Sequence, residues 1–144
     1  MLKVFLVEDE SVIRDGLRDK IPWEQYGFRF VGEAADGEMA LPMIRKTRPD
    51  VLITDIKMPF MDGLSLSKIV SEEFPRTKIV IISGYDDFEY ARKAIEVGVD
   101  QYLLKPITRL MMKKTLLELK EKIEQDMVQN DYQAQFQSEM HVYE

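Results

Sequence analysis

The stretch Val51-Leu52-Ile53-Thr54-Asp55 is a short apolar run that ends at a carboxylate. Near-continuous Val, Ile and Leu is typical of parallel strands that are covered on both faces. Three other runs end in the same way at polar residues: residues 4–7 at Glu8 and Asp9, residues 79–82 at Ser83, and residues 102–104 at Lys105. Because ligands of such sheets bind outside the carboxyl ends of the strands, we expect these polar side chains to share one crevice.

The whole chain repeats this unit as an alternation of strands and helices. The pattern predicts strands at residues 2–7, 28–34, 50–54, 78–82 and 100–104, and helices at 10–19, 37–47, 63–73, 86–97 and from 107 onward. Asp36 and Asp62 stand where they can cap the second and third helices. Each connection is long enough for a parallel crossover, so the prediction is an α/β fold with a doubly wound parallel sheet.

Length and composition narrow the class of protein. The 144 residues are enough for one folded domain. No apolar run approaches the roughly 20 residues that span a bilayer, and the amino terminus does not have the form of an export signal, so we expect a cytoplasmic protein with no membrane segment. A net charge of -6 is unfavourable for binding a phosphate backbone, so this part of the protein is not expected to bind DNA itself.

The acidic residues predict a magnesium site. The chain has no cysteine and one histidine, His141, so a metal ion would be bound by oxygen. Glu8, Asp9 and Asp55 offer such oxygens and leave room for water and a substrate phosphate, as Mg²⁺ sites usually do. Asp55 can then act as a nucleophile toward phosphorus, with Lys105 neutralising the transferring group and Ser83 hydrogen-bonding to it.

These residues resemble the receiver domain of two-component response regulators over roughly residues 1–120. The matching segments are residues 7–10, 55–59, 61–63, Ser83-Gly84 and Lys105-Pro106. The resemblance implies a flavodoxin-like (βα)5 sheet of order 2-1-3-4-5 and a cis Lys105-Pro106 bond. It also implies that Asp55 accepts a phosphoryl group from a sensor histidine kinase, with Mg²⁺ held by Glu8, Asp9, Asp55 and the main-chain carbonyl of Lys57. Self-phosphorylation and self-dephosphorylation are the only chemistry expected, so the chain is not a conventional enzyme.

The resemblance further implies a switch. Ser83 would move toward the phosphoryl group while Tyr102 rotates inward, which changes the surface of the fourth helix, fifth strand and fifth helix. From the sequence alone, an ordinary half-buried strand residue is the preferred interpretation of Tyr102, and only the resemblance reverses that preference. Lys57 and Tyr85 stand where they can shield the phosphoryl group from water, and we expect this group to be long-lived.

Segments 22–24 and 83–91 resemble the subgroup whose receiver is joined to an AraC-type DNA-binding domain. We therefore expect residues 1–122 to be the receiver and residues 123–144 a helical linker toward an output domain that this chain does not contain. DNA would be bound through that domain. Leu116, Ile123 and Asn130 repeat every seven residues, which fits either a dimerising stalk or a frayed polar tail.

Three other functions fit the sequence less well than a receiver domain does. Haloacid-dehalogenase-like phosphatases also use an aspartate after a strand, but they need a second one two residues later, where this chain has Lys57. A flavodoxin-like cofactor binder would need a glycine-rich phosphate loop, which we do not find. A degenerate receiver that acts by contact alone would not need the complete set of site residues. Trp23 and Tyr26 are expected to cover the edge of the core rather than to form a partner surface.

Overall fold

A computed structural model describes the backbone of residues 1–84 and 88–142, and the side chains of residues 1–84 and 88–131. Five parallel strands form one sheet in the order β2-β1-β3-β4-β5, which confirms the predicted topology. The strands are β1 (Leu2–Val7), β2 (Phe28–Ala34), β3 (Val51–Asp55), β4 (Lys78–Ser83) and β5 (Gln101–Leu104). The strands β1, β3 and β4 lie in the middle of the sheet and are buried more completely than the edge strands β2 and β5.

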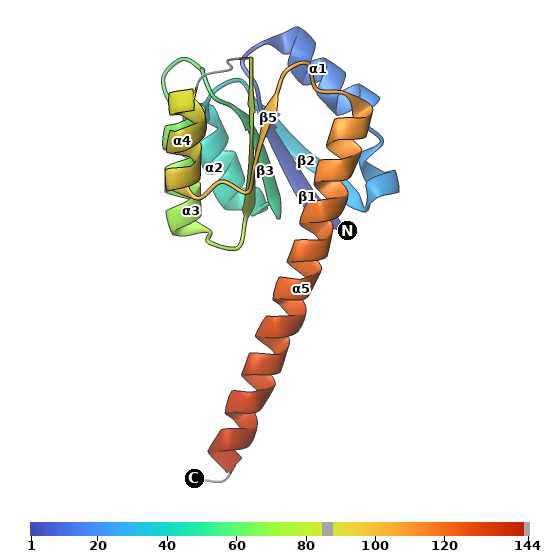
Figure 1. Cartoon of the computed structure of the whole chain (residues 1–144), viewed down its shortest axis with the longest axis vertical. Helices are drawn as coiled ribbons and strands as arrows, with labels where there is room; N and C mark the ends of the chain where they lie inside the picture. Colours follow the sequence, from blue (N-terminus) through green and yellow to red (C-terminus); the bar gives the residue numbers. More distant parts are fainter. Residues whose placement is uncertain (85–87, 143–144) are drawn as a thin grey trace.

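Helices cover both faces of the sheet (Figure 1). The helices α1 and α5 lie on one face, and α2, α3 and α4 lie on the other. Their bounds are α1 (Ser11–Lys20), α2 (Gly37–Thr47), α3 (Gly63–Glu73), α4 (Phe88–Val97) and α5 (Arg109–Val142). A short 3-10 helix, η1 (Trp23–Tyr26), joins α1 to β2. In the described part of the chain, no helix is both long and apolar enough to cross a bilayer.

The helices α2 and α3 begin directly after aspartate residues that cap them. The Asp36 carboxylate accepts a hydrogen bond from the Met39 amide at 2.8 Å, and Asp62 accepts one from Ser65 at 2.7 Å, as predicted. The helix α5 begins at Arg109 rather than at 107, because Thr108 caps it by accepting from the Met111 amide. The predicted first two residues of α4, 86 and 87, lie outside the described residues.

Each face of the sheet has its own apolar core. The core under α1 and α5 includes Leu17, Met112, Leu116 and Leu119, and the core under α2 and α3 includes Ile44, Leu66 and Val70. Trp23 is 6% exposed and packs at the edge of the first core, with its indole N–H donating to the Arg18 carbonyl. The prediction that Trp23 covers the core is thus confirmed.

The helix α5 continues beyond the sheet, away from the carboxyl ends of the strands (Figure 1). Ile123 is still part of the core, with 7% of its surface exposed. Farther along, the Asp126 carboxylate pairs with Lys78 at the start of β4, at 2.8 Å. Met127 and Val128 are exposed. Contacts between α5 and the rest of the domain therefore continue past residue 122. The boundary between a receiver of residues 1–122 and a linker of residues 123–144 stays a prediction.

Replacing Ile123 with alanine should destabilise the domain because it leaves a cavity where α5 leaves the sheet. We expect the free energy of unfolding to fall by about 2–5 kcal/mol, the range for truncating a buried isoleucine to alanine. Val128→Ala is the matched control on the exposed part of the same helix, and its effect should stay within about 0.5 kcal/mol. Equal effects of the two substitutions in urea unfolding would show that Ile123 does not belong to the receiver core.

Candidate functional site

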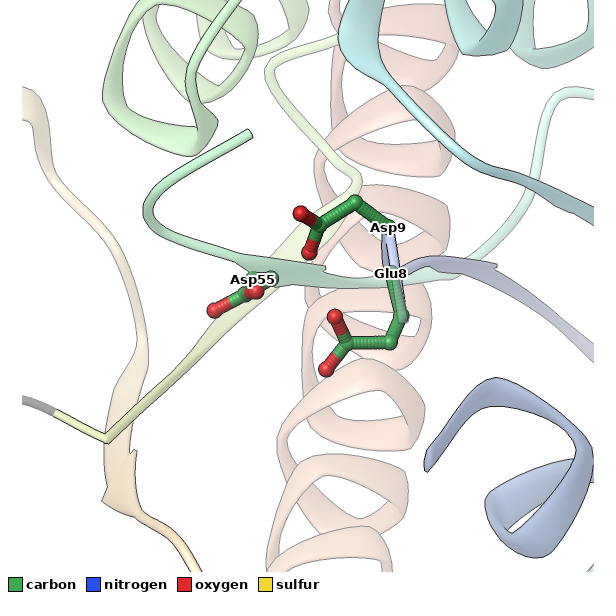
Figure 2. Close-up of side chains that lie close together, drawn as sticks. All are labelled: Glu8, Asp9 and Asp55. Carbon is green, nitrogen blue, oxygen red and sulfur yellow. The ribbon is translucent and has the colours of Figure 1, made fainter. Parts of the chain in front are cut away.

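Three acidic side chains meet at the carboxyl ends of two neighbouring strands (Figure 2). Glu8 and Asp9 directly follow β1, and Asp55 is the last residue of β3, which pairs with β1 in parallel. One carboxylate oxygen from each of them lies within 4.8 Å of the others. The parallel register of β1 and β3 therefore brings together residues that are far apart in the sequence.

Lys105 lies against this acidic cluster. Its ammonium nitrogen is 2.7 Å from Glu8 Oε1 and 3.4 Å from Asp55 Oδ2. The side chain of Lys105 is 17% exposed, and the bond that follows it, Lys105-Pro106, is cis, as the sequence resemblance implied. Lys105 directly follows β5, and its ammonium is thus paired with the carboxylate that follows β1 and the carboxylate that ends β3.

The main chain around Asp55 fixes the direction of its carboxylate. Asp55 Oδ1 accepts a hydrogen bond from the Ile56 amide at 2.8 Å, and the Gly63 amide donates to the Ile56 carbonyl at 2.8 Å. A Cβ atom on Gly63 would lie 1.9 Å from the Asp55 carbonyl oxygen. The start of α3 is therefore packed directly against the end of β3, and this approach is possible only for glycine.

Burial sets the proton affinity of the cluster. Glu8 is completely buried and Asp55 is 6% exposed, whereas Asp9 is exposed. Burial raises the pKa of Glu8 to about 7, although the Lys105 ammonium opposes the shift. Burial also raises the pKa of Asp55. For Lys105, burial lowers the pKa, but the carboxylates of Glu8 and Asp55 outweigh it and the pKa is raised overall. Without a metal ion, the buried carboxylates of Glu8 and Asp55 therefore take up protons more readily than ordinary Glu and Asp side chains.

A divalent cation fits this arrangement of donors. Glu8 Oε1 is buried, and the Lys105 ammonium lies 2.7 Å from it as an ion-pair partner. Two buried carboxylates beside a single ammonium are costly to keep ionised unless a further cation joins them. Glu8, Asp9 and Asp55 supply the hard oxygen ligands that Mg²⁺ prefers.

The remaining predicted residues surround the cluster. Ser83 is buried at the end of β4, beside β3, and its carbonyl accepts from the Lys105 amide at 2.8 Å. Tyr102 lies on β5, half-buried against a small core cluster that includes Ile81. Lys57 is exposed, with its ammonium 5.7 Å from the centre of the Tyr90 ring. Tyr85 lies outside the described residues.

Sequence reasoning missed two supporting residues of the site. Arg14 donates from α1 to the Glu8 carbonyl at 2.7 Å, and Gly63 permits the close approach of α3 to β3. The sequence predicts that Asp62 caps the helix, but only the spatial arrangement shows that a side chain at position 63 would collide with Asp55. An arginine on a predicted helix carries no comparable signal.

The raised pKa of Glu8 predicts an unusual pH dependence in the metal-free protein. The folded state binds a proton at Glu8 up to about pH 7, whereas the reference pKa of this side chain is 4.5. This contribution to stability is therefore complete below pH 4.5 and is lost as the pH rises through 7. With a chelator present, we expect the melting temperature to fall between pH 5 and pH 8.

Two comparisons check this prediction. Glu8→Gln should flatten the dependence on pH because the amide does not titrate, and Mg²⁺ should stabilise the wild-type protein more at pH 8 than at pH 5. A wild-type melting temperature that rises steadily from pH 5 to pH 8 in chelator would contradict the assigned role of Glu8.

Comparisons with known proteins agree with this geometry. Residues 4–117 match the model of the response regulator receiver domain. The chain is 41% identical over 119 residues to an uncharacterized transcriptional regulatory protein, YesN of Bacillus subtilis, which covers 83% of this chain and 32% of the relative. The chain spans less than half of the length of this and other curated relatives, including the regulator HptR of Staphylococcus aureus.

Solved structures show the same fold. The receiver domain of AraT, a response regulator from Geobacillus stearothermophilus, is 43% identical with a TM-score of 0.82, and the match covers 88% of this chain and 98% of that one. A two component transcriptional regulator AraC from Clostridium phytofermentans is 32% identical with a TM-score of 0.77, covering 90% and 99%. The family model, the relatives and the arrangement of the site agree, and the chain belongs to the receiver domain family of two-component response regulators.

Proposed function

We propose that Asp55 accepts a phosphoryl group from a sensor histidine kinase. The observation that carries this proposal is the meeting of Glu8, Asp9 and Asp55 at one point, with Lys105 paired to two of them. One oxygen of Asp55 attacks the phosphorus, the bond from phosphorus to the histidine nitrogen breaks, and the leaving imidazole nitrogen keeps the electron pair. Mg²⁺, held by Glu8, Asp9, Asp55 and the main-chain carbonyl of Lys57, would neutralise charge on the carboxylates and the transferring oxygens.

The residues of the chain orient this reaction. The Ile56 amide fixes one oxygen of Asp55, so the other oxygen is left to attack the phosphorus. Lys105 stabilises the negative charge that develops on the transferring phosphoryl group. Its ammonium is already held in place by the carboxylates of Glu8 and Asp55. Little covalent chemistry is required of the protein, because positioning and electrostatics dominate phosphoryl transfer. The domain therefore acts as a switch and not as a conventional enzyme.

We also propose how the signal leaves the site. Ser83 would bind a phosphoryl oxygen and Tyr102 would turn inward, which alters the surface of α4, β5 and α5. This surface carries several exposed apolar side chains that fit a second copy of the chain: Phe88, Ile95, Leu104, Leu110 and Leu117. The extended part of α5 is the alternative dimer contact. Residues 123–144 would lead to a DNA-binding output domain outside this chain, in a cytoplasmic regulator of transcription.

Intact mass spectrometry tests the chemistry. After incubation with acetyl phosphate and Mg²⁺, we expect the wild-type protein to gain one phosphoryl group and Asp55→Asn to gain none. A chelator should suppress the adduct, because the carboxylates of the site would then repel the donor. Asp62→Asn is the matched control, since Asn also caps a helix and the acidic cluster stays intact. An equal adduct on wild type and Asp55→Asn would remove Asp55 from its proposed role.

A further inference from the structure

The backbone of Phe60, in the loop that joins β3 to α3, is strained. Its φ angle is 67°, a left-handed value that bulky side chains rarely adopt. The Met61 amide donates to the Pro59 carbonyl at 2.8 Å, so a hydrogen bond between residues two apart closes a three-residue turn around Phe60. With a positive φ at its centre, this is the rare and strained form of the γ-turn. Glycine would adopt the same conformation at a much lower cost.

The side chain of Phe60 contributes little to the stability of the fold. Its exposed fraction is 81%, whereas the next residue, Met61, packs against the core under α2 and α3. The ring therefore gains little burial to offset the strain of its backbone. Strained backbone of this kind is concentrated at functional sites, where the surrounding structure holds it in place.

Both ends of this loop, residues 56–63, are fixed beside Asp55. Ile56 directly follows Asp55, and the Gly63 amide donates to the Ile56 carbonyl at 2.8 Å. The backbone of Gly63 is packed so closely on Asp55 that a Cβ would lie 1.9 Å from the Asp55 carbonyl oxygen. Phe60 is thus an exposed residue of a loop that begins and ends at the phosphorylation site.

A second exposed apolar side chain is on the neighbouring helix. Met39 is in the first turn of α2 and is 59% exposed. A Cβ on Gly37 would lie 2.9 Å from the Met61 side chain, so α2 begins directly against the loop that carries Phe60. Aromatic and methionine side chains are enriched in protein–protein interfaces, and methionine adapts its shape to a partner. Phe60 and Met39 therefore fit a contact with another protein.

The position of these two side chains favours one partner. The helix α5 leaves the sheet away from the carboxyl ends of the strands, so an output domain beyond it would lie at the opposite end of the molecule (Figure 1). The proposed dimer surface is on the β5 side of the sheet, whereas α2 packs on β2 and β1. A phosphohistidine donor, in contrast, has to reach the carboxyl ends of the strands, because its phosphorus must come within bonding distance of Asp55.

We infer that Phe60 is a specificity-determining residue that contacts the sensor histidine kinase during phosphoryl transfer, with Met39 beside it. This inference rests on the proposed function, because it takes Asp55 to be the acceptor. The strained turn holds the ring in solvent before the kinase arrives, and the kinase removes its apolar surface from water. A small donor such as acetyl phosphate makes no such contact, so only transfer from the kinase depends on Phe60.

Phosphoryl transfer from two donors in the presence of Mg²⁺ tests this inference. One donor is acetyl phosphate, and the other is a purified, autophosphorylated sensor histidine kinase, chosen from a panel as the one that phosphorylates the wild-type protein fastest. Phe60→Gly should slow transfer from a subsaturating kinase about 10- to 30-fold, the loss expected when an aromatic interface anchor is removed. The rate with acetyl phosphate should be unchanged.

Two further variants serve as controls. Phe60→Tyr keeps the ring and should accept the phosphoryl group from the kinase as fast as the wild type does. Val128→Ala removes exposed apolar surface from the far part of α5 and should change neither rate.

The melting temperature separates this role from a structural one. Because glycine adopts a positive φ without strain, Phe60→Gly should melt roughly 2–4 °C above the wild type while it accepts the phosphoryl group from the kinase more slowly. A residue that only supported the fold would lower the melting temperature when it is replaced.

Cross-linking reports the contact directly, whether or not Phe60→Gly folds. With p-benzoylphenylalanine in place of Phe60, illumination should cross-link the protein to the same kinase. The same photoreactive side chain in place of Val128 should give no cross-link.

Three results would overturn the inference: kinase transfer to Phe60→Gly at the wild-type rate, equal slowing with both donors, or no cross-link from position 60. Equal slowing would mean that Phe60 acts on the site itself and not on the partner. A failure of the proposed function is distinct from all three, because Asp55→Asn would then gain a phosphoryl group from acetyl phosphate as readily as the wild type.

Discussion

Gly63→Ala is expected to cost more than about 4 kcal/mol of unfolding free energy, the exceptional range for a single substitution. The new Cβ would stand 1.9 Å from the Asp55 carbonyl oxygen and 2.9 Å from the carbonyl carbon, and neither main-chain atom can turn aside. The start of α3 would have to move away from β3 and break the hydrogen bond from Gly63 to Ile56. Any variant that still folds should bind Mg²⁺ weakly, because the loop after Asp55 is displaced.

Gly16→Ala provides a control with the opposite expected sign. Gly16 lies inside α1, and a Cβ there would meet no atom within 4 Å. Alanine in the interior of a helix should stabilise the protein by roughly 0.5–1 kcal/mol relative to glycine. Urea unfolding of the two variants measures both effects. A Gly63→Ala protein as stable as the wild type would show that α3 does not approach β3 this closely.

Lys105→Met should slow phosphorylation by acetyl phosphate about 10²–10³-fold, the usual loss when a preorganised electrostatic group is removed from an active site. The substitution keeps most of the aliphatic stem but removes the ammonium that lies 2.7 Å from Glu8 and 3.4 Å from Asp55. Without that cation, both buried carboxylates should take up protons more readily, which also weakens Mg²⁺ binding near neutral pH.

The rate of adduct formation, followed by intact mass at saturating Mg²⁺, measures this effect. Lys113→Met is the matched control, because Lys113 is exposed on α5, and its rate should equal that of the wild type. If Lys105→Met is phosphorylated as fast as the control, the ion pairs at the site play no part in phosphoryl transfer.

The fold was predictable because local patterns determine it. The apolar runs of residues 4–7 and 79–82 have the composition of strands buried on both faces, and Asp36 and Asp62 mark helix starts by their capping chemistry. The meeting of Glu8, Asp9 and Asp55 then follows from parallel topology, since the ends of parallel strands lie at one edge of the sheet.

Other features depend on contacts between distant side chains, which have no periodicity in the sequence. The approach of Gly63 to Asp55, the Lys57–Tyr90 contact and the ion pair between Lys78 and Asp126 are of this kind. Each depends on the exact distance between two elements. The pattern of apolar and capping residues predicts the helices and strands but not the distances between them.

The site of phosphorylation tests the central claim most directly. Sodium borohydride reduces an acyl phosphate to an alcohol with release of phosphate, so that a phosphorylated aspartate becomes homoserine. After treatment with acetyl phosphate, Mg²⁺ and then borohydride, we expect peptide sequencing by mass spectrometry to find homoserine at position 55, and none when a chelator replaces Mg²⁺. Homoserine at position 9 or 62 instead, or an equal yield at position 55 in chelator, would contradict the account.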